Sequence, residues 1–297
     1  MNVRHLRGVE KRQNIHGWLF AALAVVLIVS FSFYPVISSF ILSFQTGKGA
    51  IYKFNGLGNI VRLLSDTVFK QALINTFIYF LFQVPAMTML ALIIATILNH
   101  PKLKFKGFFR TAIFLPCVTS LVAYSVLFRS MFSLNGLVNR GLLFLNVISA
   151  PIPWLFDAFW AKVLIILALT WRWTGYNVVF YLSALQNIDP FIYEAAEIDG
   201  ATKTKQFFYI ILPMLTPVIL FTSVLSTIGT LQLFDESFNI TGGGPGNATI
   251  SLSHYIYNIL FRFTPNFGYA STISYVIVFF VAILAYFQFK VAGERHE

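Results

Sequence analysis

The sequence predicts an all-α membrane protein with six transmembrane helices, and three observations carry this prediction. First, 57% of the 297 residues are hydrophobic and only 11% are charged, whereas about a quarter of the residues in a soluble domain are charged. Second, six apolar runs are long enough to cross a bilayer, which takes about 20 residues. Third, Lys and Arg lie at the ends of these runs. The net charge of +10 therefore indicates a membrane rather than a nucleic-acid partner.

Each of the six apolar runs is expected to form one membrane span. The predicted spans are 18–44, 72–98, 108–131, 160–183, 209–233 and 269–290. The first span is longer than the core of a signal peptide, so we expect it to be retained. The predicted organisation is an N-terminal segment 1–17, a six-helix transmembrane domain 18–290 and a tail 291–297.

The distribution of basic residues predicts the orientation in the membrane, because cytoplasmic loops are enriched in Lys and Arg. Four groups of bases fall on one side of a six-span protein: Arg4, Arg7, Lys11 and Arg12; Lys102, Lys104, Lys106 and Arg110; Lys203 and Lys205; Lys290 and Arg295. Both termini are therefore expected in the cytoplasm. The bias is incomplete, because the first of the expected external loops, 45–71, 132–159 and 234–268, also carries Lys48, Lys53, Arg62 and Lys70.

An unusual cytoplasmic segment, residues 186–206, joins the fourth and fifth spans. Its second part overlaps the stretch "YEAAEIDGATKTKQFFYIILPMLTP", residues 193–217, which continues into the fifth span. Asp189 and Pro190 predict the start of a helix, and Gly200 predicts its end. A second helix is expected to lead into span five. The residues alone leave open whether this segment is only a solvated amphipathic hairpin at the membrane surface.

The same stretch resembles the EAA loop in the membrane subunits of binding-protein-dependent ABC importers. The matching residues are Glu194, Ala195, Ala196, Gly200, Ile210, Leu212 and Pro213. The stretches "FNGLGNI" (54–60), "ALINTFIYF" (72–80), "FFRTAIFLPCVTSLVA" (108–123) and "TGGGPGNAT" (241–249) are similar to the carbohydrate branch of that family, the maltose-type permeases. The resemblance covers nearly the whole chain.

This resemblance implies the transmembrane domain of a type I ABC importer, with a cytoplasmic coupling helix in 186–206. The residues implied to couple to an ATPase subunit are Tyr193, Glu194, Ala195, Ala196, Asp199 and Gly200. Ala195 and Ala196 would form a closely packed face, and Gly200 the turn. The implied partners are a second, homologous permease subunit, two ATPase subunits, an extracytoplasmic solute-binding protein and a carbohydrate, in the inner or plasma membrane of a bacterium.

Chemical motifs are sparse in this chain. It has no GxxxxGK[ST] phosphate loop, only one cysteine (Cys117), and five histidines that are scattered and lie outside the predicted spans. We therefore expect neither an enzyme nor a metal or cofactor site. ATP and Mg²⁺ are expected on the partner ATPase subunits.

Arg172 lies about halfway along the fourth predicted span, where a charge is costly and often functional. Leu169, Arg172, Trp173 and Tyr176 share one helix face because they are spaced at i, i+3, i+4 and i+7. Aromatic rings and a guanidinium suit a polyol, so we expect this face to contact the solute. The alternative is an Arg that snorkels to the membrane surface between interfacial aromatic residues.

Further candidate residues of the substrate pathway lie on spans three and five. Ser226, Thr230 and Leu233 share a face of span five, although such hydroxyls more often bond their own backbone or a neighbouring helix. Weaker candidates on span three are Ser120 and Tyr124. Asp235 and Glu236 follow span five on the outside, where they are expected either to touch a binding protein or to be solvated.

The function expected from the sequence is that of an ATP-driven importer's permease subunit that translocates a carbohydrate, most simply an oligosaccharide. One alternative is an ion-coupled secondary sugar transporter, but that mechanism needs acidic or His groups near the midplane of the membrane. The predicted spans contain almost no carboxylate away from their ends. The other alternative is a membrane scaffold without a transported solute.

Overall fold

The computed structural model describes residues 17–48 and 51–293. Nearly all of the predicted N-terminal segment 1–17, with Arg4, Arg7, Lys11 and Arg12, lies outside the described residues, and so does the end of the predicted tail 291–297. The chain divides into two compact units, one of Met1–Arg62 with Ile259–Tyr275 and one of Leu63–Asn258 with Val276–Glu297.

In the first unit, the first membrane span is a helix over Gly17–Ser43. It contains a π-helical turn, η1 (Val29–Phe33), followed by α2 (Tyr34–Ser43). The start of α13 (Phe267–Gly293) meets the end of this span. The Thr272 hydroxyl donates to the Ser43 carbonyl at 3.1 Å, and the Tyr275 hydroxyl donates to the Val36 carbonyl at 2.6 Å.

A short β-hairpin interrupts the otherwise helical chain in this unit. The strands β1 (Gln45–Lys48) and β2 (Ile51–Phe54) form an antiparallel hairpin in which Gln45 pairs with Phe54. The Asn59 side chain, on α3 (Gly58–Ser65), donates to the carbonyls of Ser43 and Gln45 at 2.9 and 2.8 Å. These bonds satisfy backbone groups where the helix ends and the hairpin begins.

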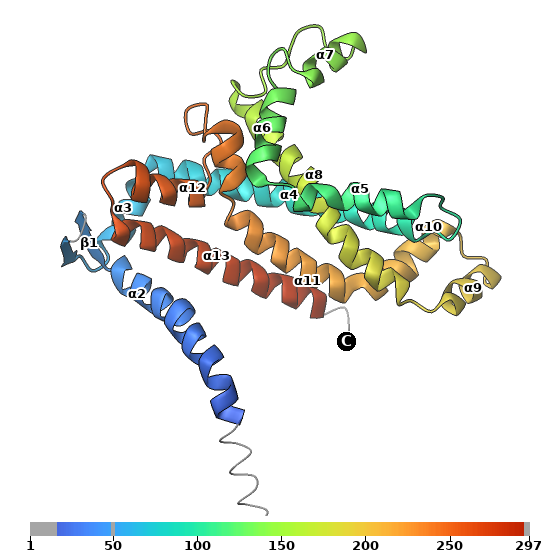
Figure 1. Ribbon diagram of the computed structural model, residues 1–297, viewed down its shortest axis with the longest axis horizontal. Helices are drawn as coiled ribbons and strands as arrows, with labels where there is room; N and C mark the ends of the chain where they lie inside the picture. Colours follow the sequence, from blue (N-terminus) through green and yellow to red (C-terminus); the bar gives the residue numbers. More distant parts are fainter. Residues whose placement is uncertain (1–16, 49–50, 294–297) are drawn as a thin grey trace, which may run out of the picture. The chain divides into compact units, whose positions relative to one another are not determined.

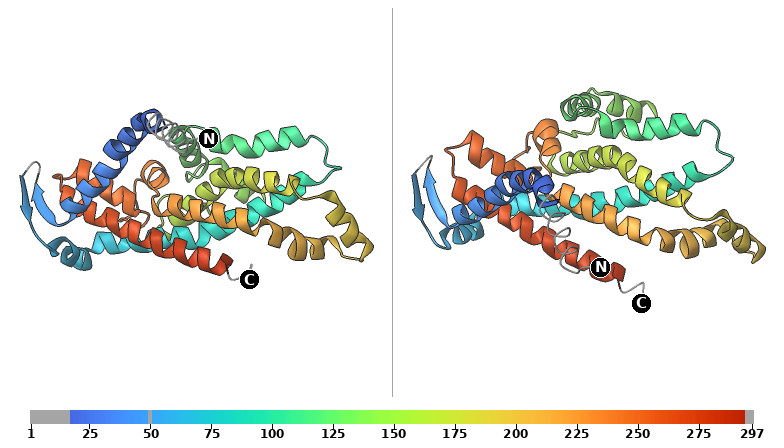
Figure 2. Two further views of the ribbon diagram at one scale, coloured as in Figure 1. Left: turned by 90° about the horizontal axis from the view of Figure 1, so that it is seen from below. Right: turned by 60° about the horizontal axis from the view of Figure 1, so that its bottom comes forward.

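The second unit is built on three long helices: α4 (Thr67–Asn99), α8 (Ala158–Gln186) and α11 (Leu212–Leu231). They run side by side (Figures 1 and 2). Asp66 caps α4 and Asp157 caps α8, because each carboxylate accepts two backbone N–H groups of the first turn. Such caps satisfy the free N–H groups at a helix start.

Short elements join or follow these helices. They are α7 (Leu137–Phe144), α9 (Pro190–Ile198), α10 (Lys203–Gln206), η2 (Phe207–Ile211), η3 (Ser237–Thr241), α12 (Leu252–Tyr257) and η4 (Asn258–Arg262). Asn139 of α7 is fully buried and organises the loop between α6 (Leu121–Met131) and α8. Its amide donates to the Ile152 carbonyl at 2.9 Å and accepts from the Trp154 indole at 3.1 Å.

Five helices of the described chain are long and apolar enough to span a membrane, in agreement with five of the predicted spans. The third predicted span, 108–131, is not one helix. It consists of α5 (Lys106–Val118) and α6 (Leu121–Met131), which are bent against each other by 100°. Pro116 removes a backbone donor near the end of α5, and Thr119 is extended with ψ of 149°. The pair counts as a sixth span if the bent helices cross together.

Gly175 sets the closest approach between α5 and α8. A Cβ atom at this position would lie 2.0 Å from the Ile113 carbonyl oxygen and 3.3 Å from the Cys117 sulfur. The Ile113 carbonyl oxygen belongs to the backbone, so it cannot rotate away as a side chain could. The two helices therefore pack at a distance that only glycine permits, as small residues allow in membrane bundles.

We predict that Gly175→Ala destabilises the bundle by about 1–3 kcal/mol, the usual cost of forcing an extra group into a packed site. The matched control is Gly107→Ala in α5, because an added Cβ there meets nothing within 4 Å. Thermal unfolding of the purified chain in detergent measures both variants. Equal melting temperatures for the two variants would contradict the predicted contact.

Candidate functional site

A cavity of about 390 Å³ lies within the second unit, between α4, α8, α11 and the segment that follows α11. Seven of the nine side chains predicted for the substrate pathway line it: Leu169, Arg172, Trp173, Tyr176, Ser226, Thr230 and Leu233. The prediction that the first four share one helix face is thus confirmed. Their role in contacting solute stays a prediction.

Arg172 is the charged side chain of α8 at this cavity, and it is only 5% exposed. Its Nη2 atom donates to the Thr119 carbonyl at 3.3 Å, at the break between α5 and α6. The guanidinium carbon also lies 4.9 Å from the centre of the Tyr124 ring and 5.6 Å from that of Trp173. Arg172 therefore does not snorkel to the surface, but is held inside by a carbonyl and two ring faces.

Several polar atoms at the cavity have no hydrogen-bond partner among the described residues. They are Nε and Nη1 of Arg172 and Oδ1 of Asn177, all buried. Each unsatisfied buried polar group costs about 1–3 kcal/mol. Arg172 and Asn177, which carry these buried atoms, line the cavity beside the rings of Trp173 and Tyr176. Unpaired polar groups next to aromatic rings suit a polyhydroxylated occupant.

The opposite wall of the cavity includes polar side chains that sequence reasoning missed. The Thr230 hydroxyl of α11 lies 2.8 Å from the Gln83 side-chain oxygen of α4 and 2.8 Å from the Ser226 carbonyl oxygen, and its single proton serves one of these acceptors at a time. Asn177 and Gln83 each donate to the Met87 sulfur at 3.2 Å. The sequence feature that could have indicated this polar wall is Gln83, a single amide side chain within the apolar run of span two.

The two remaining candidates for the substrate pathway, Ser120 and Tyr124, do not line the cavity. Ser120 is exposed in the break between α5 and α6. Tyr124 lies behind the lining, where its hydroxyl donates to Glu236 at 2.7 Å. Glu236 is 3% exposed, so the expectation that it touches a binding protein or is solvated is wrong. Its carboxylate is directed inward and is bonded within the same chain.

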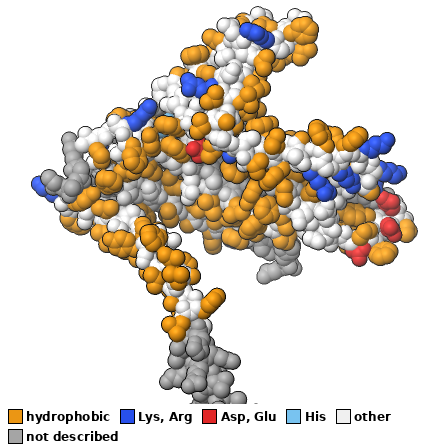
Figure 3. Space-filling model, viewed as in Figure 1, with side chains coloured by type: hydrophobic (Ala, Val, Ile, Leu, Met, Phe, Trp, Pro, Cys, Tyr) orange, Lys and Arg blue, Asp and Glu red, His pale blue; other side chains and the backbone are white. Residues whose placement is uncertain are grey.

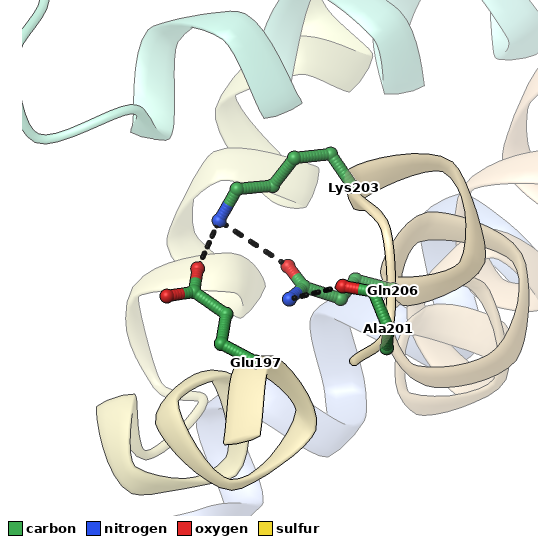
Figure 4. A network of polar contacts seen from close by, with 4 residues as sticks. All are labelled: Glu197, Ala201, Lys203 and Gln206. Atoms are coloured by element: carbon green, nitrogen blue, oxygen red, sulfur yellow. Dashed lines mark hydrogen bonds and ion pairs between the residues drawn. The ribbon is translucent and has the colours of Figure 1, made fainter. Parts of the chain in front are cut away.

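The segment 186–206 forms the predicted helical hairpin. Helix α9 begins at Pro190, with the Asp189 side chain accepting from the Phe191 N–H at 3.0 Å. Gly200 has φ of +75° and ends it, as a left-handed residue after a helix commonly does. Figure 4 shows the bonds that close the turn: Lys203 contacts Glu197 and Gln206, and the Gln206 amide donates to the Ala201 carbonyl.

The Glu197–Lys203 ion pair sets the electrostatics of this turn. The hydrogen bond from Lys203, together with its charge, lowers the pKa of the Glu197 carboxyl. A lowered pKa means that the pair is fully formed above the ordinary carboxyl pKa and is lost as the pH falls through the lowered value. Both side chains are exposed, so the pair shapes the turn and adds little stability.

Helix α9 has one face toward its own chain and one face toward solvent. Ala196 is buried, and Tyr193 packs against the core cluster of α4, α8 and α11. The opposite face exposes Phe191, with 74% of its surface accessible, and Ile198, with 86%. The expectation that Ala196 belongs to a face open to an ATPase is therefore wrong, because the helical period turns it inward. Figure 3 shows acidic side chains gathered at this end of the unit.

A multi-pass helical bundle with an internal cavity and a helical hairpin between its fourth and fifth spans is typical of the membrane-spanning subunit of a solute transporter. The chain belongs to the family described as the binding-protein-dependent transport system inner membrane component, whose sequence profile matches residues 55–293. It is therefore a multi-pass membrane subunit of an ABC transport system. This family assignment favours the expected importer over an ion-coupled carrier or a scaffold.

Curated relatives match nearly the full chain. The chain is 59% identical over 289 residues to the lactose transport system permease protein LacF of Rhizobium radiobacter, covering 97% of each. It is 32% identical over 284 residues to the arabinooligosaccharides transport system permease protein AraP of Halalkalibacterium halodurans, covering 95% of this chain and 89% of that protein.

Solved structures support the fold. One chain of a bacterial ABC transporter involved in the import of the acidic polysaccharide alginate aligns with a TM-score of 0.78 at 22% identity, covering 98% of this chain and 99% of that one. A chain of the alginate transporter in complex with its alginate pentasaccharide-bound periplasmic protein aligns with a TM-score of 0.73 at 23% identity, covering 97% of this chain and 95% of that one. The predicted fold, the transmembrane domain of a type I ABC importer, is confirmed.

Proposed function

We propose that this chain is the permease subunit of an ATP-driven importer that translocates a carbohydrate, and that the solute passes through the cavity beside Arg172. The observation that carries the proposal is that Arg172 and Asn177 line one cavity with Trp173 and Tyr176, and that both carry buried polar atoms without a partner among the described residues. Sugar hydroxyls both donate and accept hydrogen bonds, and the apolar faces of sugar rings suit aromatic walls.

The names of the relatives support a saccharide and suggest its size. LacF is named for lactose and AraP for arabinooligosaccharides, and the identity to LacF is the higher of the two. A cavity of about 390 Å³ falls at the small end of the range of roughly 300–1,000 Å³ for ligand sites. Lactose, or another short saccharide, is therefore the first solute to test.

The proposed assembly contains a second, homologous permease subunit, two ATPase subunits that hold ATP and Mg²⁺, and an extracytoplasmic solute-binding protein. Support comes from the family description, which names a binding-protein-dependent system, and from the solved complex with a periplasmic protein. Both termini are proposed to lie in the cytoplasm of a bacterial cell, with the hairpin of α9 and α10 on the same side.

The proposed coupling step uses the two faces of α9. Phe191, Glu194, Ala195 and Ile198 are spaced at i, i+3, i+4 and i+7 and are exposed, so they form a continuous outer face for an ATPase. On the inner face, Tyr193 packs on the cluster of α4, α8 and α11. A movement of the ATPase would thereby reach α8, which carries Arg172, through packed side chains.

Arg172→Ala is expected to lower saccharide uptake by about 10- to 100-fold. The reason is that a hydrogen bond to a charged group contributes about 1.5–3 kcal/mol. The measurement is uptake of radiolabelled lactose by vesicles that contain the complete transporter. The matched control is Arg129→Ala, which removes the same side chain from an exposed position on α6 outside the cavity.

Unchanged uptake by assembled Arg172→Ala transporter would remove this side chain from the pathway and leave the proposal without its main support. Loss of uptake by Arg129→Ala to the same degree would show a general effect of deleting an arginine.

Gly200→Val is expected to uncouple ATP hydrolysis from transport. Its φ of +75° costs a β-branched residue about 1–3 kcal/mol of backbone strain, although an added Cβ itself meets nothing within 4 Å. Gly200→Asn is the matched control, because Asn tolerates the left-handed region. ATPase activity and lactose uptake are measured together in vesicles, and full uptake by both variants would contradict the coupling role.

A further inference from the structure

A second cleft, of about 230 Å³, lies between α5 and α8, with Leu98 of α4 at its side. It shares no lining residue with the cavity at Arg172. Its volume is below the range of roughly 300–1,000 Å³ typical of sites that enclose a whole small molecule. The cleft therefore suits one part of a larger molecule whose remainder lies outside.

The cleft is polar at one end and apolar along its length. Helices α5 and α8 run in opposite directions through the bundle (Figure 1). Arg110 of α5 lines the cleft together with residues of the final turns of α8. Ser183 and Gln186 line the same end. Deeper in the bundle the lining is apolar, with Ile113, Val178 and Val179. This gradient matches an amphipathic molecule with a polar head and a hydrocarbon chain.

The charge that α5 and its preceding link bring to the polar end is positive, whereas the acidic residues from Asp189 onward follow the end of α8. Lys102, Lys104, Lys106 and Arg110 lie on the link and the first turns of α5, and Figure 3 shows Lys and Arg side chains gathered at this end. No Asp or Glu occurs in the sequence between Asp66 and Asp157. Among the described residues, none of the four bases takes part in an ion pair. The head group that fits the side formed by α5 and its link is therefore an anion.

We propose that the cleft binds an anionic phospholipid of the leaflet on the side predicted to be cytoplasmic. Its phosphate lies at Arg110, and one acyl chain lies between α5 and α8. Basic pockets between transmembrane helices bind anionic head groups in this way. A soluble anion would not use the apolar walls, and Val179, 48% exposed, leaves the cleft open at the surface of this chain for an acyl chain to enter.

The test is lipid retention by the complete purified transporter, measured by native mass spectrometry. The transporter is incubated with equal amounts of phosphatidylglycerol and phosphatidylcholine that carry the same acyl chains. We expect the unaltered protein to retain phosphatidylglycerol in preference. Arg110→Gln is expected to lower that retention by about fivefold, the factor that one basic residue contributes near an anionic head group.

Two further variants separate a built site from a general surface charge. Lys102→Gln makes the same charge change on the same basic link but outside the cleft, and it is expected to reduce retention less than Arg110→Gln does. Val179→Phe fills the apolar part without a charge change, and it is expected to lower retention of phosphatidylglycerol.

Three results would overturn the proposal. The first is equal retention of the two lipids by the unaltered transporter. The second is an equal loss in Arg110→Gln and Lys102→Gln, which would indicate diffuse attraction. The third is a cross-link from Ser183→Cys to a partner subunit in a transporter that retains no lipid, which would show that protein covers the cleft.

Discussion

The hydrogen bond from Arg172 to the Thr119 carbonyl is the interaction on which the rest of the site depends. It joins the middle of α8 to the point where α5 and α6 part by 100°. A carbonyl that a broken helix leaves unpaired is costly within a membrane, and so is a buried guanidinium. The hydrogen bond between the Thr119 carbonyl and the Arg172 guanidinium offsets part of the free-energy cost of burying each. The break also places the Tyr124 ring next to the guanidinium. Nε and Nη1 of Arg172 are buried without a partner among the described residues.

A continuous packed path runs from this interaction to the hairpin at the membrane surface. Helix α8 carries Arg172, passes Gly175 at the close contact with α5, and ends at Gln186, just before α9. Tyr193 of α9 packs on the cluster that holds Val178, Tyr181 and Leu185 of α8 together with parts of α4 and α11. Packed cores switch between discrete arrangements rather than deform gradually. This arrangement is the physical basis for coupling a partner's motion to the cavity.

The sequence predicted the long spans and the hairpin because these depend on local properties: apolar length, the cap at Asp189, and the glycine at position 200. It also predicted that Leu169, Arg172, Trp173 and Tyr176 share a face, which follows from the helical period alone.

The sequence failed to predict features that depend on contacts between residues far apart in the chain. The apolar run 108–131 hid the break at Thr119, because the Thr119 carbonyl accepts there from Arg172, a partner distant in the sequence. The burial of Glu236 depends on Tyr124, and that of Ala196 on which face of α9 meets the bundle. Neither arrangement leaves a local signature.

The most direct test of the central claim, that a saccharide occupies the cavity beside Arg172, is protection of a cysteine within it. Ser226→Cys, combined with Cys117→Ser, places one thiol on the cavity wall. The complete transporter is labelled with a water-soluble thiol reagent, with and without lactose delivered by its binding protein. The account predicts slower labelling of the thiol at position 226 when lactose is delivered. A labelling rate that lactose does not change, in a transporter that still takes up lactose, would contradict it.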